Sequence, residues 1–370
     1  MIVSKNAQAL IDVFTNDHKF KLKGTGPISF HLGCDFFRDE DGVLCYAPRK
    51  YIIKVLDNYK RLFGTNLKQA SSPLVKGDHP KLDTSPLLDV EHVKIYQSLI
   101  GGLQWAIQIG RFDVGTATMT MSRFRAAPRE GHLDRVKRII GYLSKMRNGV
   151  IRIRTEEPDY SQLENKEYDW FYTCYGGAEE ELPTDAPRPL GKRIITSSYV
   201  DANLYHDLVS GKSVTGILHF FNKTPIDWFT KLQSTVETAT FGSEYIAART
   251  CTEQIIDLRN TLRYLGVPVE GPSYMFGDNE TVVNTASHPH GRLHKRHNAL
   301  AFHKTRWCIA AGIVYFHHVQ GETNPADILS KHWDYPSVWS QLRPLLFWRG
   351  DTGNLLTEAG EKKVEDGKEG

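Results

Sequence analysis

Apolar and polar positions alternate with a strand-like rhythm near the start of the chain and with a helix-like rhythm after it. Two short apolar runs, HLGCDFF and GVLCYAP, flank the polar segment RDEDG, and its Asp-Gly pair predicts a β-hairpin. A helix is predicted over 49–63. Residues 96–122 form a long apolar stretch, and Pro128 opens a further helix whose apolar stripe is Leu133, Val136, Ile140 and Leu143. These elements predict a small helical core.

The helix after Pro128 also carries basic side chains away from its apolar stripe. They are Arg135, Lys137, Arg138, Lys145 and Arg147. Side chains of this kind can line a nucleic-acid backbone. The same pattern is more typical of a helix face that is simply exposed to solvent. Both interpretations stay open on the sequence alone.

A second arrangement begins near residue 193, where the runs RIITSSYV, SVTGILHFF and TPIDWFT predict three adjacent antiparallel strands. The pattern then predicts a long helix over 237–265, a strand at SYMFG and a helix through Ala286. A second helix over about 297–311, a strand at IVYFHHV and a turn of helix after Pro325 complete the series. The predicted class is α/β (α+β), with a mixed sheet and helices.

Shifts in composition divide the 370 residues into four segments. Residues 1–150 form the first block, and 151–190 form an acidic linker with several Pro and Gly residues, which favours an irregular connector. Residues 191–335 hold the predicted mixed sheet, and 336–370 form a C-terminal extension. From about residue 351 the extension has little to bury, so we expect a disordered tail.

Charge and cysteine content narrow the function classes. The chain has 46 Lys+Arg and 43 Asp+Glu, a net charge of +3, so any nucleic-acid surface has to be local. Five cysteines without metal-ligand spacing fit a reducing compartment with free thiols. The N-terminus does not read as a secretory signal, and no stretch approaches the roughly 18 apolar residues of a membrane span. We therefore expect an intracellular protein without a membrane partner.

Two aspartates stand directly after apolar strand runs. Asp201 follows the run that ends in Val200, and Asp278 follows SYMFG. Polar groups at strand ends of an α/β sheet can converge on one crevice, where carboxylates are candidate metal ligands. A single Asp after a strand is more often a turn residue. The pair is therefore informative only if further acids join it.

Two further acids extend this set. Glu244 continues a buried helical stripe through Ala248 and Cys251, and a buried carboxylate needs a compensating cation, either a metal or a Lys or Arg side chain. A frayed helix start would instead leave Glu244 in solvent. Asp327 follows Pro325 in the first helical turn, where a carboxylate can simply compensate the helix dipole. Together the four acids predict one shared site of hard oxygen ligands, which suits Mg²⁺.

Longer motifs carry a resemblance that goes beyond these acids. GKSVTGIL, PIDWFTKLQSTVETATFGSEYIA, MFGDNETVV, LHKRHNALAFH and NPADILSKHW resemble, in order and spacing, the RNase H domain of copia-type retrotransposons. The first block resembles the same Pol polyprotein through GPISFHLGCDFFRDEDGVLCYAPRKYIIKVLDNY and YQSLIGGLQWAIQIGRFDVGTATMTMSRF. The resemblance implies an RNase H-like mixed five-stranded sheet with helices. It also implies that 1–150 are the end of a reverse transcriptase, namely palm end, thumb and connection.

The resemblance further implies an RNA·DNA-hybrid ribonuclease, an endonuclease that hydrolyses the RNA strand by a two-metal reaction. The four family positions that hold two Mg²⁺ ions, with Mn²⁺ as an alternative, match Asp201, Glu244, Asp278 and Asp327. The implied partners are the RNA·DNA hybrid and other parts of the Pol polyprotein. The implied locations are the cytoplasm, in virus-like particles, and the nucleus.

Two departures from the family leave alternatives open. In the family a paired-Asp polymerase motif precedes the residues that resemble MIVSKN, so we expect no polymerase activity from this chain. Ala299 stands where the family often has Asp, two residues after His297. The alternative function is a non-catalytic nucleic-acid-binding remnant of a truncated polyprotein. An integrase-like nuclease is disfavoured, because it would need its acids in the order Asp, Asp, Glu.

Overall fold

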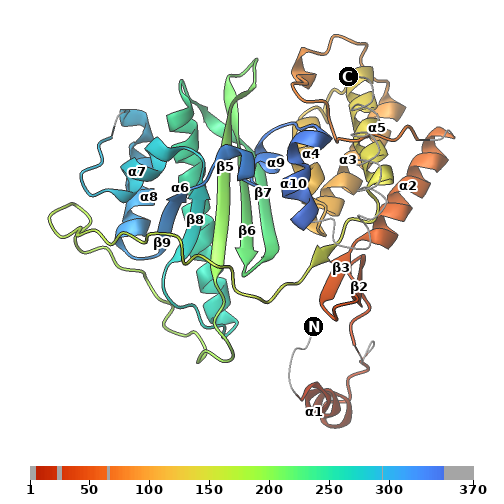
Figure 1. The fold of residues 1–370 in the computed structure, drawn as a ribbon. Helices are drawn as coiled ribbons and strands as arrows, with labels where there is room; N and C mark the ends of the chain where they lie inside the picture. Colours follow the sequence, from red (N-terminus) through yellow and green to blue (C-terminus); the bar gives the residue numbers. More distant parts are fainter. Residues whose placement is uncertain (1–5, 23–26, 65–66, 294, 346–370) are drawn as a thin grey trace, which may run out of the picture.

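The computed structural model describes residues 6–22, 27–64, 67–293 and 295–345. The tail predicted from about residue 351 lies outside these ranges. Two sheets and several helices make up the fold (Figure 1). No helix in the described ranges combines the length and the apolar composition that crossing a membrane requires.

The first sheet is small and antiparallel, in the order β1-β2-β3-β4. Its strands are β1 (Phe30–His31), β2 (Cys34–Arg38), β3 (Leu44–Ala47) and β4 (Ile151–Arg152). The predicted hairpin is confirmed, because β2 pairs with β3 around the Asp-Gly turn. Helix α2 (Arg49–Phe63) has the predicted bounds and ends at Gly64, whose left-handed backbone conformation favours glycine.

The other helices of the first block are α1 (Ala7–Asp12), α3 (Val90–Gln108), α4 (Gly115–Ser122) and α5 (Glu130–Lys145). The apolar stretch 96–122 is therefore two helices, separated by a short 3-10 turn at Phe112–Val114. Helix α5 buries the stripe predicted for it, including Leu133, Val136 and Ile140. The predicted helical core is confirmed.

Two of the basic side chains on α5 make contacts within the protein. The guanidinium group of Arg135 pairs with Asp78 at 2.8 Å and also with Asp83, and so fastens the loop between those residues. The ammonium group of Lys137 lies over the ring of Phe63, 4.9 Å from its centroid. The hypothesis that α5 lines a nucleic-acid backbone is therefore wrong for Arg135, because its charge is already neutralised by two carboxylates.

The second sheet has five strands in the order β7-β6-β5-β8-β9. Strands β5 (Thr196–Asp207), β6 (Lys212–Phe221) and β7 (Thr224–Val236) form an antiparallel meander. Strands β8 (Ser273–Gly277) and β9 (Val314–His318) run parallel to β5. This is the mixed five-stranded sheet that the resemblance to RNase H implies, and the predicted fold class is confirmed.

Helices cover both faces of this sheet (Figure 1). Helices α6 (Thr240–Tyr264), α7 (Glu280–Ser287) and α8 (Ala299–Ala310) pack on one face around a core that includes Val200, Ile255 and Phe302. Helices α9 (Asp327–Ser330) and α10 (Tyr335–Leu345) lie on the other face, beside the helices of the first block. Helix α10 begins one residue before the boundary at 336, so the predicted extension starts with an ordered helix.

One apolar core joins the first block to the second sheet. It contains Leu103 and Met121 from α3 and α4, Leu218 from β6, and Ile328 and Leu329 from α9. Because these side chains are buried against one another, separating the two halves would expose the back face of the sheet. The division of the chain at 150 and 190 therefore stays a prediction about sequence segments.

The linker after β4 is irregular, as its composition predicted, but it is docked. The side chains of Trp170 and Tyr175 are buried, and the guanidinium group of Arg306 on α8 lies 4.9 Å and 5.2 Å from their ring centroids. The carboxylate of Glu180 accepts hydrogen bonds of 2.7 Å from Arg259 and 2.8 Å from Arg263, both on α6. The linker is thus held along α6 and α8.

The ion pairs of Glu180 with Arg259 and Arg263 should stabilise the linker in its docked position. Burial acts to raise the pKa of Glu180, but the hydrogen bonds from Arg259 and Arg263 lower it to about 2. Because this pKa lies below that of the unfolded chain, the pairing stabilises the docked linker above about pH 4.5 and is lost as the pH falls toward about 2.

The exposed linker residues Phe171 and Tyr172 are cleavage sites for chymotrypsin. We expect Glu180→Gln to speed chymotrypsin cleavage of the linker several-fold at pH 7. The matched control is Glu181→Gln, which changes the exposed neighbour. Equal cleavage rates for wild type and Glu180→Gln at pH 7 would show that the two arginines do not hold the linker.

Candidate metal centre

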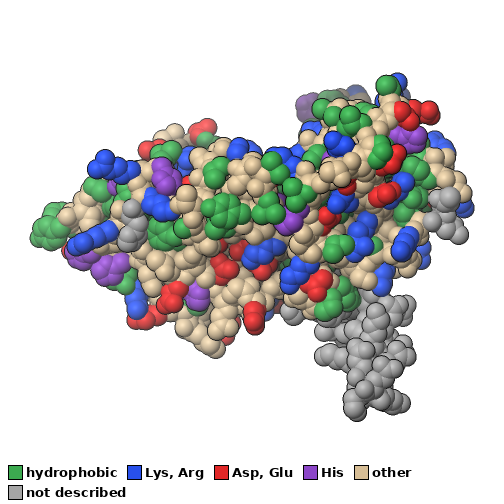
Figure 2. All heavy atoms as spheres, turned by 90° about the horizontal axis from the view of Figure 1, so that it is seen from above, with side chains coloured by type: hydrophobic (Ala, Val, Ile, Leu, Met, Phe, Trp, Pro, Cys, Tyr) green, Lys and Arg blue, Asp and Glu red, His purple; other side chains and the backbone are tan. Residues whose placement is uncertain are grey.

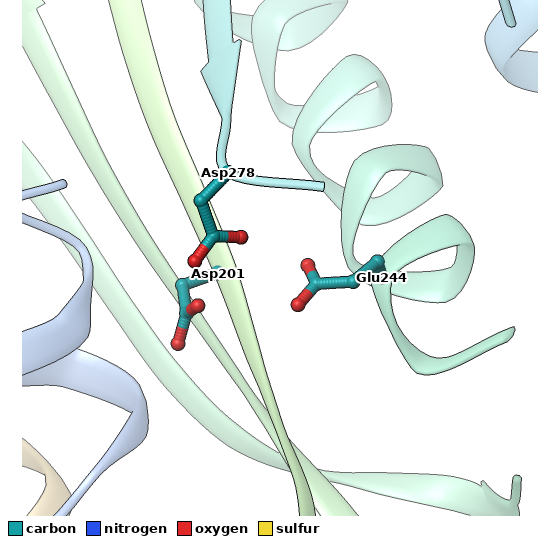
Figure 3. A group of neighbouring side chains, drawn as sticks. All are labelled: Asp201, Glu244 and Asp278. Atoms are coloured by element: carbon teal, nitrogen blue, oxygen red, sulfur yellow. The ribbon is translucent and has the colours of Figure 1, made fainter. Parts of the chain in front are cut away.

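Three carboxylates from three separate elements meet beside the centre of the second sheet (Figure 3). Asp201 lies within β5, Glu244 lies near the start of α6, and Asp278 directly follows β8. One oxygen from each side chain lies within 4.8 Å of the others. Asp201 and Glu244 are buried, with 1% and 5% of their surface exposed, so the cluster is not a set of surface acids.

The register of the sheet explains why the two aspartates meet. In the parallel pair β5 and β8, Val200 lies opposite Gly277, so the residues that follow them, Asp201 on β5 and Asp278 directly after β8, are neighbours. Adjacent strands are about 4.8 Å apart, which places two carboxylates within reach of one ion. One detail of the prediction is wrong: Asp201 does not end its strand. Strand β5 continues to Asp207, because its polar residues still pair with β6.

Helix α6 brings the third carboxylate to the same point. Glu244 lies among the buried residues of α6, such as Ala248 and Cys251, as its spacing predicted. Burial, followed by the charges of Asp201 and Asp278, raises the pKa of Glu244 well above its usual range. Burial and the charge of Asp201 raise the pKa of Asp278 in the same way. Ionising these carboxylates together is therefore unfavourable unless a cation lies among them.

The fourth predicted ligand, Asp327, is not part of this cluster of three. It begins α9, and its Oδ1 lies 2.7 Å from the ammonium group of Lys331, one helical turn later. The same ammonium group lies 3.4 Å from Oδ1 of Asp201. The hydroxyl of Ser330 donates a hydrogen bond to the other oxygen of Asp201. Burial and the charge of Asp201 raise the pKa of Asp327 to about 7.

A pocket of about 470 Å³ adjoins the three carboxylates. Its other lining residues include Asn203, Thr240, Asn279, Thr281 and Lys331. The donor set fits a divalent cation, because the carboxylates are hard oxygen ligands and their mutual repulsion is relieved by positive charge. On the face seen in Figure 2, the basic and acidic side chains of the described residues are interspersed and do not gather into one basic surface.

Three residues that shape this region were not predicted from the sequence. Lys331 and Ser330 bind Asp201, and the only sequence signal for Lys331 was its i,i+4 spacing from Asp327. Glu237, which is buried, lies 2.9 Å from the Nε2 of His297 and so orients this exposed histidine. No pattern in the sequence linked those two residues, which are 60 positions apart.

No protein-family model matches the chain. The retrovirus-related Pol polyprotein from transposon TNT 1-94 of Nicotiana tabacum is 26% identical over 319 residues, 84% of this chain and 21% of that polyprotein. The corresponding polyprotein from transposon RE1 of Arabidopsis thaliana is 22% identical over 313 residues, 85% of this chain and 18% of that polyprotein. The chain is similar to part of a transposon Pol polyprotein. The resemblance to copia-type retrotransposons is thereby confirmed, and the chain spans about a fifth of the length of these relatives.

Solved structures of RNase H domains are also similar to part of the chain. RNase H1 from the archaeon Halobacterium salinarum is 14% identical, with a TM-score of 0.29, and covers 38% of this chain and 95% of its own. LC11-RNase H1, solved in complex with an RNA/DNA hybrid, is 16% identical, with a TM-score of 0.30, and covers 36% of this chain and 93% of its own.

Proposed function

We propose that residues 191–335 form a metal-dependent endonuclease that hydrolyses the RNA strand of an RNA·DNA hybrid, within the Pol polyprotein of a copia-type retrotransposon. The observation that carries this proposal is the cluster of Asp201, Glu244 and Asp278, whose oxygens lie within 4.8 Å of one another. The motifs shared with the RNase H domain of that family, and the similarity to transposon Pol polyproteins, support it.

Each of the four acidic residues has a role in this proposal. Asp201, Glu244 and Asp278 hold a divalent ion, with Mg²⁺ as the expected ion and Mn²⁺ as a substitute. Asp327 adds a fourth carboxylate on the other side of Lys331 from Asp201. Bound divalent ions supply Lewis-acid chemistry, favouring attack by water on the phosphodiester and stabilising charge on the leaving oxygen. The carboxylates act as ligands, and their burial keeps bulk water from weakening the electrostatic interactions.

The walls of the pocket would contact the substrate. Asn279 and Thr281 line the pocket with groups that can donate hydrogen bonds to phosphate or to a 2′-hydroxyl. Recognition of a hybrid depends on its shape and on the 2′-hydroxyls of the RNA strand, and not on base sequence. We therefore expect cleavage at many positions along a hybrid.

Cleavage of labelled nucleic acids by the full chain tests the proposal. With Mg²⁺, we expect internal cuts in the RNA strand of an RNA·DNA hybrid, and no cuts in single-stranded RNA or in double-stranded DNA. Chelation of the metal with EDTA should abolish the cuts, and added Mg²⁺ should restore them. If the hybrid stays intact at saturating Mg²⁺ and the protein is shown to be folded, the nuclease proposal is contradicted, and the alternative of a non-catalytic nucleic-acid-binding protein takes its place.

A further inference from the structure

The ammonium group of Lys331 lies between two of the four predicted metal ligands. Its Nζ is 2.7 Å from Oδ1 of Asp327 and 3.4 Å from Oδ1 of Asp201. The side chain of Asp201 is 1% exposed, whereas that of Lys331 is 37% exposed. Lys331 therefore presents a full positive charge to a buried carboxylate while part of its side chain stays at the surface.

Asp201 belongs to two groups at once. It is one of the three carboxylates that converge with Glu244 and Asp278, and it is also the carboxylate that Lys331 and Ser330 contact from α9. The four acids therefore form a cluster of three and one separate carboxylate. Three of them converge without an intervening basic side chain, and Asp327 is joined to the set through Lys331.

We propose that Lys331 is an internal cation that occupies the second metal position, between Asp201 and Asp327, as long as no substrate is bound. This inference rests on the proposed function and adds a rule for metal binding. The protein without substrate binds one divalent ion, at Asp201, Glu244 and Asp278. The second position opens when Lys331 turns away from the two aspartates.

Charge and mobility both support this role. A divalent ion and an ammonium group cannot both occupy the space between Asp201 and Asp327, because each would need the same oxygen atoms, Oδ1 of Asp201 and Oδ1 of Asp327. Lysine carries its charge on a flexible four-carbon stem, so it can leave without any movement of α9. Lys331 also lines the pocket, where a phosphate group of the substrate would offer it a new partner. Substrate binding would then draw Lys331 away from the two aspartates, and the second ion would take its place.

Counting bound Mn²⁺ tests the inference without measuring cleavage. The free Mn²⁺ remaining in solution is measured by electron paramagnetic resonance during titration of the full chain. We expect one bound ion for wild type and two for Lys331→Met, with affinity at the second position raised at least about tenfold, or about 1.4 kcal/mol. The double variant Lys331→Met/Asp327→Asn should return to one ion, because the second position loses its own carboxylate.

A matched lysine provides the control. Lys81 pairs with buried Asp207 at 3.2 Å, and the side-chain exposures of that pair, 37% and 1%, equal those of Lys331 and Asp201. Lys81→Met should still bind one Mn²⁺ ion. If circular dichroism shows that Lys331→Met does not fold, Lys331→Gln carries the same test, since its amide can still donate hydrogen bonds to the aspartates.

The outcomes separate this inference from the proposed function. Two ions on wild type, or one ion on both wild type and the folded Lys331 variant, would overturn the role of Lys331 and leave the metal centre standing. No ion on wild type would instead contradict the metal centre itself. Two ions on Lys81→Met would show that losing any buried lysine–aspartate pair creates a metal site, which would also overturn the inference.

Discussion

Asp278→Asn is expected to reduce Mg²⁺-dependent cleavage of a hybrid by at least about 100-fold, because several kcal/mol of transition-state stabilisation depend on the bound ion. The substitution keeps the size of the side chain and one of its oxygens but removes the charge that helps to hold the ion. Asp278 lies at the open side of the cluster, directly after β8, so the fold should remain intact. The measurement is the initial rate of cleavage by both proteins at the Mg²⁺ concentration that just saturates wild type.

The same variant should hold or raise thermal stability when no metal is present. Burial and the charge of Asp201 raise the pKa of Asp278, so its ionised form destabilises the folded state at any pH above that pKa. The advantage of Asp278→Asn should therefore be greatest near pH 8 and shrink as the pH falls toward 4. A matched control is Asp257→Asn on the exposed side of α6, which should change neither cleavage nor stability.

Two results would exclude Asp278 from the site. One is a hybrid cleavage rate for Asp278→Asn equal to that of wild type. The other is a clear loss of stability without metal, which would identify Asp278 as a structural residue that makes a favourable cap or ion pair. Melting curves with and without Mg²⁺, recorded beside the cleavage assay, distinguish these cases.

Gly216→Ala is expected to destabilise the protein by roughly 1–3 kcal/mol, because a methyl group there has no room. Gly216 lies on β6 opposite Asp201, and the backbone of α9 crosses directly above it. An added Cβ would lie 2.7 Å from the carbonyl oxygen of Ala326 and 2.8 Å from the backbone nitrogen of Ser330. Helix α9 would have to move outward, and Ser330 and Lys331 would move away from Asp201.

Urea denaturation of Gly216→Ala measures this effect on the free energy of unfolding. The matched control is Gly101→Ala on α3, where an added Cβ meets nothing within 4 Å. That control should hold or raise stability by up to about 1 kcal/mol, because alanine favours a helix more than glycine does. Equal stability for Gly216→Ala and wild type would mean that α9 does not pack on β6 as described.

Local patterns predicted the elements of this fold well. The bounds of α2 and the β2–β3 hairpin follow from apolar periodicity and from an Asp-Gly turn. The burial of Glu244 followed from its place in the apolar stripe of α6. Asp201 was placed at a strand end because the residues after it are polar, although backbone pairing with β6 keeps β5 extended to Asp207. Side-chain polarity is a weak guide where the ladder of backbone hydrogen bonds continues.

Contacts between distant segments could not be predicted from local patterns. The docking of α3 and α4 onto the back of the second sheet depends on which apolar faces meet, and each face alone fits many partners. The sequence alone allowed Arg135 to contact nucleic acid, because its partners Asp78 and Asp83 lie more than 50 residues away in the chain. Lys331 was visible only as a neighbour of Asp327, and its contact with Asp201 joins residues 130 positions apart.

Diffraction from crystals of the full chain soaked in Mn²⁺ tests most directly whether Asp201, Glu244 and Asp278 form a metal centre. We predict an anomalous peak about 2 Å from an oxygen of each of the three carboxylates. Crystals that bind Mn²⁺ elsewhere and show no peak among these three side chains would contradict the claim.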